Sequence, residues 1–145
     1  MMGRSNVKRF VAYSAAGALL AALAIAAHLS ASAPALAATA PVDGKAIFAT
    51  NCSSCHASAG QGAPGLAPPL AKNPYVTGDP KKVCLTVLHG MTGKIVVHGT
   101  SYDGQMPPWK DALSNAEIAA VVSYVRTSWG NKASKVTEKQ VKSLK

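Results

Sequence analysis

Two cysteines and a histidine stand close together at positions 52–56, in the order Cys-Ser-Ser-Cys-His. On one helical turn, Cys52 and Cys55 can reach the two vinyl groups on one edge of a single porphyrin and bond to them as thioethers. The same turn carries the imidazole of His56 under the iron. Because C-x-x-C-H is the attachment signature of c-type haem, the sequence predicts one covalently bound haem c with His56 as an iron ligand.

Thiols at this spacing also serve two other chemistries. A thioredoxin-type redox site would need a strand before the motif and a βαβ pattern around it, and the sequence shows neither. A zinc site would need a fourth ligand at a suitable spacing, which Cys84 or His89 could supply only by accident. Haem attachment is therefore the favoured interpretation.

A haem iron held from both sides needs a second axial ligand, and Met106 is the predicted one. Its thioether is a soft donor, and the two prolines that follow it stiffen the loop that must hold the sulfur near the iron. Met91, His89 and His98 are the alternatives, together with an open sixth position. Met91 follows a predicted helix end, where packing suits it better, and ligation by either histidine would give a lower reduction potential.

Glycine and proline are dense between residues 60 and 69, which predicts an irregular loop. Pro68 stands in this loop, twelve residues beyond His56. A metal-ligating histidine usually donates its second ring N–H to an acceptor such as a carbonyl, which fixes the tautomer and the orientation of the ring. The carbonyl of Pro68 is the predicted acceptor.

The N-terminal segment has the pattern of a secretory signal. Residues 1–9 carry three basic side chains and no acid, residues 10–29 are largely apolar, and residues 35–37 form an Ala-Leu-Ala cleavage site. Residues 1–37 are therefore predicted to be a signal peptide, and the mature chain would begin at Ala38. The alternative is an uncleaved membrane anchor, although the run is alanine-rich and only weakly hydrophobic. Both outcomes deliver the rest of the chain outside the cytoplasm.

The remaining 108 residues suit a single domain. A chain of this length buries a thin core, and a covalently held porphyrin would supply much of the missing apolar volume. Without the three basic residues of the signal segment, twelve basic side chains stand against six acidic ones. The mature chain is therefore basic.

A first helix is predicted over residues 42–57, with Asp43 as its N-cap. Gly44 and Phe48 are four apart and share one face, so a second helix can approach closely beside the aromatic ring. The helix also has a partial apolar stripe, made of Ala46, Ile47 and Ala49.

A second helix is predicted to begin at Asp79 and Pro80, as N-cap and first helical residue, and to end at Gly90. Cys84 has no partner there, because the other two cysteines are assigned to the haem. A buried, inert thiol is expected from its apolar neighbours, with an intermolecular disulfide as the alternative. The apolar face of this helix consists of Val83, Val87 and Leu88.

The strongest predicted helix follows a capping box, formed by Ser114 and Glu117, and is ended by Gly130. It should cross the first helix at the glycine and phenylalanine named above, through Tyr124 or Val125. Its apolar residues recur at helical spacing: Ile118, Val121, Val122 and Val125.

Two shorter segments carry weaker patterns. A β-like run at residues 95–97 is bounded by turn residues. The tail, residues 131–145, holds five lysines and one acid. Residues 137–144 are predicted either to dock as a short helix, through Val136, Val141 and Leu144, or to form a frayed basic end.

With these residues together, the chain resembles a class I c-type cytochrome of the bacterial monohaem branch, over roughly residues 42–130. The resemblance implies an all-α fold of three or more helices wrapped around one haem. It also implies a cytochrome c domain at residues 38–130, thioethers at Cys52 and Cys55, and axial ligation by His56 and Met106. Three further residues are expected to surround the haem: Pro68, Tyr102 and Trp109. The residues that carry the resemblance are Gly44, Phe48, Cys52–His56, Pro68, His89, Gly90, Tyr102, Met106, Pro107, Ser114, Glu117, Ile118, Tyr124 and Val125.

The resemblance further implies a periplasmic electron carrier rather than an enzyme, whose iron cycles between Fe(II) and Fe(III) between a respiratory donor and an oxidase or reductase. One alternative is a haem subunit bound to a periplasmic dehydrogenase. The other is a haem enzyme or gas-binding sensor with an open sixth position. Redox proteins with acidic docking surfaces are the expected partners, and nucleic acid is not. Five lysines could ring the haem edge and steer such partners: Lys72, Lys81, Lys82, Lys94 and Lys110.

Overall fold

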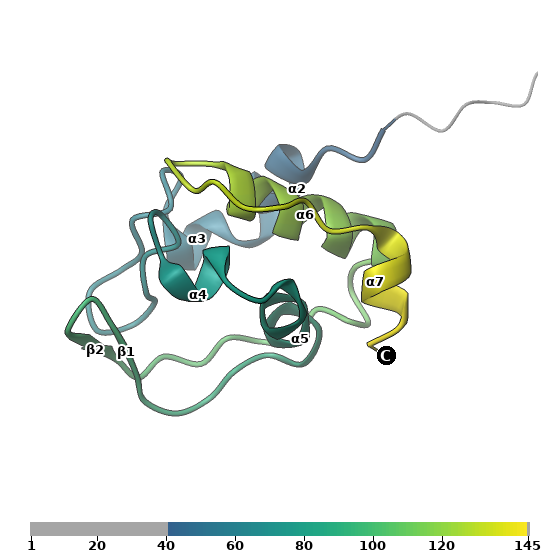
Figure 1. Cartoon of the computed structure of the whole chain (residues 1–145). Coiled ribbons are helices and arrows are strands. Elements are labelled where there is room, and N and C mark those ends of the chain that lie inside the picture. Colours follow the sequence, from purple (N-terminus) through teal and green to yellow (C-terminus); the bar gives the residue numbers. More distant parts are fainter. Residues whose placement is uncertain (1–40, 145) are drawn as a thin grey trace, which may run out of the picture. The chain divides into compact units, whose positions relative to one another are not determined.

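The computed structural model describes residues 41–144, so the predicted signal segment lies outside the described residues. This range contains six helices, α2 (Gly44–Asn51), α3 (Ser53–His56), α4 (Pro74–Thr77), α5 (Pro80–His89), α6 (Asn115–Thr127) and α7 (Glu138–Lys142). An antiparallel hairpin of β1 (Ile95–Val97) and β2 (Thr100–Tyr102) lies between α5 and α6 in the sequence (Figure 1). No described helix is both long and apolar enough to cross a membrane.

The central element is α6, against which α2, α4, α5 and α7 all pack. Its predicted capping box is present: the Ser114 hydroxyl accepts from the Glu117 N–H at 3.2 Å, and the Glu117 carboxylate accepts from the Ser114 N–H at 2.8 Å. The helix ends at Thr127, before the predicted stop at Gly130. Its end comes early because the backbone is already extended at the C-cap Ser128, with φ at −102° and ψ at 165°. Trp129 and Gly130 then have positive φ, at 52° and 84°.

The first helix crosses α6 where the sequence predicted. A Cβ on Gly44 would lie 2.5 Å from the carbonyl carbon of Ala120, so only glycine permits this approach. Phe48 is 2% exposed, and its ring centroid lies 5.6 Å from that of Tyr124. The predicted apolar stripe is partly wrong, because the alanines at positions 46 and 49 are exposed. Burial on this helix is confined to the glycine and the phenylalanine.

The C-terminal segment docks as a helix on the rest of the domain. Thr137 caps α7, and Val141 on that helix is fully buried. Val136 and Val141 join Cys84 and Leu88 of α5 and Ile118 of α6 in one apolar cluster. Cys84 is 1% exposed, and burial raises the pKa of its thiol. The buried thiol predicted from the sequence is therefore present, and an intermolecular disulfide through this residue is ruled out in the folded chain.

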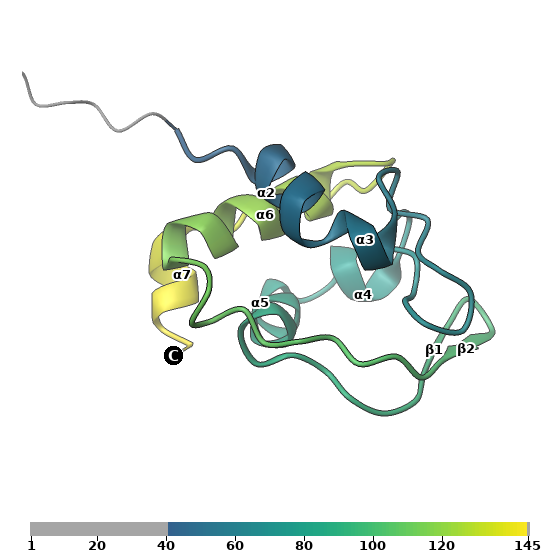
Figure 2. The ribbon, with the colours of Figure 1, turned by 180° about the vertical axis from the view of Figure 1, so that it is seen from behind.

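Three features differ from the sequence predictions, and the last of them, a small sheet, departs from an all-α fold. The first predicted helix is broken at Cys52, so that residues 53–56 form the separate helix α3. The short helix α4 was not predicted, although Asn73 and the proline after it form an ordinary N-cap and first helical residue. The β-like run pairs with a second strand across a turn in which His98 and Gly99 both have positive φ, as type I′ hairpins require. Seen from behind, the hairpin lies at the same end of the domain as α3 and α4, away from α7 (Figure 2).

Candidate haem-binding site

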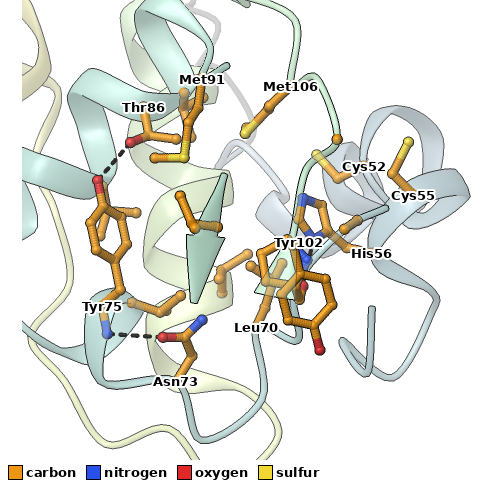
Figure 3. Close-up of a pocket in the computed structure, with 18 of the residues that line it drawn as sticks. Cys52, Cys55, His56, Leu70, Asn73, Tyr75, Thr86, Met91, Tyr102 and Met106 are labelled. Atoms are coloured by element: carbon orange, nitrogen blue, oxygen red, sulfur yellow. Dashed lines mark hydrogen bonds between the residues drawn. The ribbon is translucent and has the colours of Figure 1, made fainter. Parts of the chain in front are cut away.

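A cavity of about 610 Å³ opens between α3, α5, α6 and the hairpin, and its lining is mostly apolar. This volume is in the usual range of cofactor pockets. We call residues 52–71 the His wall and residues 91–109 the Met wall, because these two segments face the cavity with the residues predicted to ligate iron (Figure 3). Valines of α5 and α6 complete it, namely Val83, Val87, Val121, Val122 and Val125.

The C-x-x-C-H motif is placed by the break between α2 and α3. The Cys52 N–H still donates to the carbonyl of Phe48 at 2.9 Å, and the Cys52 carbonyl accepts from the His56 N–H at 3.0 Å. The motif therefore occupies one new helical turn that starts at the first cysteine. Cys52, Cys55 and His56 all line the cavity from this turn, as the sequence predicted for a shared porphyrin edge.

The electrostatic setting of the first thiol argues against a reactive dithiol. Burial, with a smaller contribution from the neighbouring Cys55, raises the pKa of Cys52 from 9.0 to about 11. Thioredoxin-type cysteines are activated by the opposite shift, towards the thiolate. No strand precedes the motif within residues 41–144, and the hairpin is antiparallel. The thioredoxin-type alternative is therefore not supported.

The His56 imidazole is oriented by the hydrogen bond that the sequence predicted. Its Nδ1 lies 3.1 Å from the carbonyl oxygen of Pro68. A carbonyl only accepts, so Nδ1 carries the proton and Nε2 keeps its lone pair for a metal. Burial lowers the pKa of His56, and the bond to Pro68 opposes this shift in part. The ring is thus favoured in the neutral form that metal ligation needs.

Two methionines, not one, reach the cavity from the Met wall. Met91 and Met106 exchange both backbone hydrogen bonds, at 3.0 and 2.9 Å, as an isolated antiparallel bridge. Side chains of directly opposed residues stand on the same face of such a pair, and both thioethers line the cavity. The expectation that packing at the helix end is the better role for Met91 left out this pairing, which joins it to Met106.

The two histidines considered as alternative iron ligands differ in whether they line the cavity. His98 lines the cavity but is exposed at the hairpin turn, whereas His89 does not line it. Tyr102 and Trp109, which were expected to surround the haem, both line the cavity and are half-buried. The Trp109 N–H donates to the Val87 carbonyl at 3.0 Å and ties the end of the Met wall to α5.

A group of polar side chains at the cavity was missed in the sequence. Asn73 is 3% exposed, and its oxygen accepts from the Tyr75 N–H at 2.9 Å. The hydroxyls of Tyr75 and Thr86 lie 2.8 Å apart. Figure 3 shows these three side chains on the side of the cavity away from the two cysteines. The Asn-Pro pair at positions 73–74 was the available signal, because it marks a helix start that brings Tyr75 to the cavity.

The residues present fit a haem better than a zinc ion. Within the described part of the chain, His, Cys, Asp and Glu side chains form no group of three or more that could hold a metal ion. The cavity instead combines two thiols, the half-buried imidazole of His56, the exposed imidazole of His98 and two thioethers with a largely apolar wall. Imidazole and thioether are donors that suit iron in haem proteins, and an apolar wall suits the porphyrin plane.

Comparison with known proteins gives the same result. Residues 41–129 match the Cytochrome c family. Cytochrome c-552 of Thermus thermophilus is 38% identical over 118 residues, which cover 74% of this chain and 78% of the relative. The cytochrome c subunit of an alcohol dehydrogenase (quinone) from Gluconacetobacter polyoxogenes is 38% identical over 97 residues, covering 66% of this chain and 20% of the relative. The cbb3-type cytochrome c oxidase subunit FixP of Bradyrhizobium diazoefficiens is 36% identical over 100 residues, covering 67% and 33%.

The family match extends from the start of the described residues to Trp129, so it includes the motif, both walls of the cavity and the helix α6. Members of this family bind haem c covalently and carry electrons. The chain therefore belongs to the cytochrome c family, and is an electron-transfer haem protein of the class I c type.

Proposed function

We propose that this chain binds one haem c through Cys52 and Cys55, holds its iron between His56 and Met106, and carries electrons in the periplasm. The observation that supports this most directly is the composition of a single cavity. Its lining combines the two thiols, the His56 imidazole with a free Nε2, and the thioether of Met106, whose backbone is paired with that of Met91. These are the groups that covalent attachment and axial ligation from two sides require.

The bound haem would supply a one-electron Fe(III)/Fe(II) couple. The protein residues bind it, orient it and keep water away. Pro68 fixes the ring of His56 through the 3.1 Å hydrogen bond, and the Met91 pair fixes the backbone of Met106. With both axial positions filled by the chain, no position is left for a substrate, which favours electron transfer over haem catalysis.

The two edges of the cavity carry different side chains, and this difference matches the two edges of a haem. The thiols lie on one side, and Asn73, Tyr75 and Thr86 lie on the side away from them (Figure 3). Haem carries its vinyl groups and its carboxylates on opposite edges. The thiols would therefore meet the vinyl edge, and these polar side chains would meet the carboxylates.

An apolar rim offers a contact surface for a redox partner. Leu66 is 54% exposed and Val96 is 67% exposed, and both line the cavity. All five lysines predicted to surround the haem edge are exposed, but none of them lines the cavity. Lys94 stands between Gly93 and Ile95, which do line it. The lysines would therefore steer an acidic partner at a distance, while the rim makes the contact.

A second candidate is an electron-transfer subunit bound to a dehydrogenase or an oxidase. Its support is the similarity to the two relatives named as subunits of such enzymes. The chain spans only 20% of the length of the dehydrogenase subunit. A free carrier and a bound subunit would use the same cavity and the same ligands, and differ in whether the protein is purified alone or with a catalytic partner.

The decisive experiment is expression in a host able to mature cytochromes, followed by mass spectrometry and absorption spectroscopy. We expect a mass increase equal to one haem, loss of the first 37 residues, and the band near the red end of the oxidised spectrum that reports Fe–S(Met) ligation. A colourless product would refute haem binding. Absence of the band, with ready binding of carbon monoxide to the reduced protein, would instead indicate a gas sensor or haem enzyme.

A further inference from the structure

The turn after α6 has an unusual backbone. Trp129 and Gly130 have φ angles of 52° and 84°, and the Asn131 N–H donates to the Ser128 carbonyl at 2.9 Å. A bulky residue such as tryptophan rarely adopts positive φ. Such strain persists only where the surroundings impose it, and it is concentrated at functional sites. We call residues 128–131 the α6 turn. The contacts of its Trp129 and Asn131 side chains show which surroundings impose this backbone conformation.

The Trp129 ring presses on the His wall. A Cβ on Gly60 would lie 2.6 to 2.9 Å from three atoms of this ring, so the indole rests directly on the Gly60 backbone. The other side of the contact is rigid, because the ring centroid lies 4.9 Å from that of Phe48 and 5.3 Å from that of Tyr124. Trp129 therefore fixes the beginning of the loop that follows the haem motif.

Asn131 holds the end of the same loop. Its side chain is 4% exposed, and its Nδ2 donates to the Leu70 carbonyl at 2.9 Å and to the Val125 carbonyl at 2.7 Å. Its Oδ1 is buried and has no hydrogen-bond partner. The amide cannot turn around, because its oxygen would then face two carbonyl oxygens. Asn131 therefore serves as a double donor that ties Leu70 to the last turn of α6.

The contacts of Trp129 and Asn131 both act on the loop that carries the Pro68 carbonyl, the hydrogen-bond acceptor of His56. The Gly60 carbonyl accepts from the N–H groups of Leu70 and Ala71, at 2.7 and 3.0 Å, and closes the loop into a ring. Pro68 lies inside this ring, two residues before Leu70. A Cβ on Gly62 would lie 2.8 Å from the Pro68 oxygen, so the carbonyl has little room to move. Its place is set by Gly60 and Leu70, which the α6 turn holds.

We propose that Trp129 and Asn131 are positioning residues for the axial histidine. By holding Gly60 and Leu70 they place the Pro68 carbonyl, and through it they set the orientation and basicity of the His56 imidazole. This inference rests on the haem ligation proposed above. A firm Nδ1–H···O=C bond strengthens Nε2 as a donor, which favours Fe(III) and lowers the reduction potential. Loosening the α6 turn should therefore raise the potential.

The test compares matured haem-bound Asn131→Ala with wild type and with Val141→Ala. The control removes buried volume from the cluster of Val141 with α5 and α6 residues. That cluster is separate from the one that Trp129 and Phe48 belong to. Two quantities are measured: the solvent exchange rate of the His56 Nδ1 proton by NMR, and the reduction potential. In Asn131→Ala we expect exchange to accelerate about tenfold, the factor carried by one ordinary hydrogen bond, and the potential to rise. In Val141→Ala we expect lower stability with both quantities unchanged.

A second variant, Trp129→Phe, tests the contact between the Trp129 ring and Gly60. It also provides the test if Asn131→Ala does not mature. It keeps an aromatic ring but reduces the contact with Gly60, and should shift both quantities in the same direction. Wild-type values in these variants, a fall in potential, or equal shifts in Val141→Ala would overturn the proposal. A wild-type protein without haem would overturn the proposed function instead, so the two failures are distinguishable.

Discussion

The two walls of the cavity present their iron ligands in different ways. The His wall is joined to the scaffold at several points: the α3 turn, the bond from His56 to Pro68, and the contacts of Trp129 and Asn131. The Met wall is an extended loop with a hairpin of two three-residue strands, and its Val96 and His98 are exposed. We conclude that the imidazole is held rigidly, whereas the thioether is held by a more adaptable segment.

This difference has a physical origin. Few buried contacts and exposed backbone bonds lower the free energy of local opening. The Met wall is held by the Met91–Met106 pair and by two further backbone bonds, from Trp109 to Val87 at 3.0 Å and from Asp103 to Gly65 of the His wall at 3.1 Å. Opening it exposes little of the apolar core, whose buried members belong to helices or to the C-terminal segment. The thioether should therefore be the first ligand lost under stress.

The largest effect is expected from the double substitution Cys52→Ala with Cys55→Ala on the His wall. Without the two thiols no thioether can form, although the imidazole and the cavity remain. Acidified organic solvent should then extract all of the haem from the variant and none from the wild type. Retention of pigment by the variant would mean that another residue attaches the haem. Cys84→Ala is the matched control, and it should keep its haem because that thiol is buried away from the cavity.

A large but reversible effect is expected on the Met wall. Met106→Ala should abolish the Fe–S(Met) band, whereas Met91→Ala should keep it and cost about 1–2 kcal/mol of stability, since the side chain is only half-buried. Absorption spectra and urea denaturation of both variants measure this. The opposite result, with the band lost only in Met91→Ala, would assign the ligand to Met91. A band that survives in Met106→Ala but disappears when Met91→Ala is added would show that the Met91 thioether can replace that of Met106 as the ligand.

A smaller effect is expected at Gly90, the residue directly before the Met wall. A Cβ on Gly90 would meet Pro108 N at 3.0 Å and the Met106 carbonyl at closer range, with φ at 76°. The ψ of Gly90 is −175°, so the residue lies in a backbone region that is almost restricted to glycine. Gly90→Ala should cost about 1–3 kcal/mol from the backbone conformation and about 1–3 kcal/mol more from the contact. It should also weaken the Fe–S(Met) band, because the Met106 backbone must shift.

Gly99→Ala is the control for that variant. Gly99 has φ at 79°, but a Cβ there meets nothing within 4 Å. Only the cost of the backbone conformation should appear, with an unchanged spectrum. Chemical denaturation and the oxidised spectrum of the two variants provide the comparison. Equal losses of stability with equal spectra would show that the close contact at Gly90 is not what holds the Met wall.

The features that the structure confirms are those whose sequence signals are local. The motif spans five residues, and Asp43, Asp79 and Ser114 each cap a helix within three residues of themselves. The crossing at Gly44 was also predictable, since a glycine four residues before an aromatic marks a close helix contact. Short-range chemistry of this kind is visible without knowledge of the fold.

The parts that were missed depend on contacts distant in sequence. The bridge between Met91 and Met106 joins residues fifteen apart through backbone atoms, which no side-chain pattern marks. The bond from Asn131 to Leu70 spans 61 positions. The helix break at Cys52 was missed because its two halves are each helical and only the backbone angle between them changes. The docking of α7 was one of two alternatives, since five residues of helix carry little pattern of their own.

The smallest expected effect lies outside both walls, at the capping box of α6. Hydrogen bonds from the Ser114 N–H and hydroxyl lower the pKa of the Glu117 carboxyl. The folded state therefore releases this proton at lower pH than the unfolded state. The resulting stabilisation is present above the unfolded pKa and is lost as the pH falls through the lowered folded value. Wild type should exceed Glu117→Gln in denaturation midpoint at neutral pH, and the two should converge in acid.

The Fe–S(Met) band should stay the same in both, because this change weakens the scaffold without touching either wall. A band that changes with Glu117→Gln would mean that the Met wall takes its rigidity from the start of α6, and that the contrast between the walls is weaker than their contacts indicate.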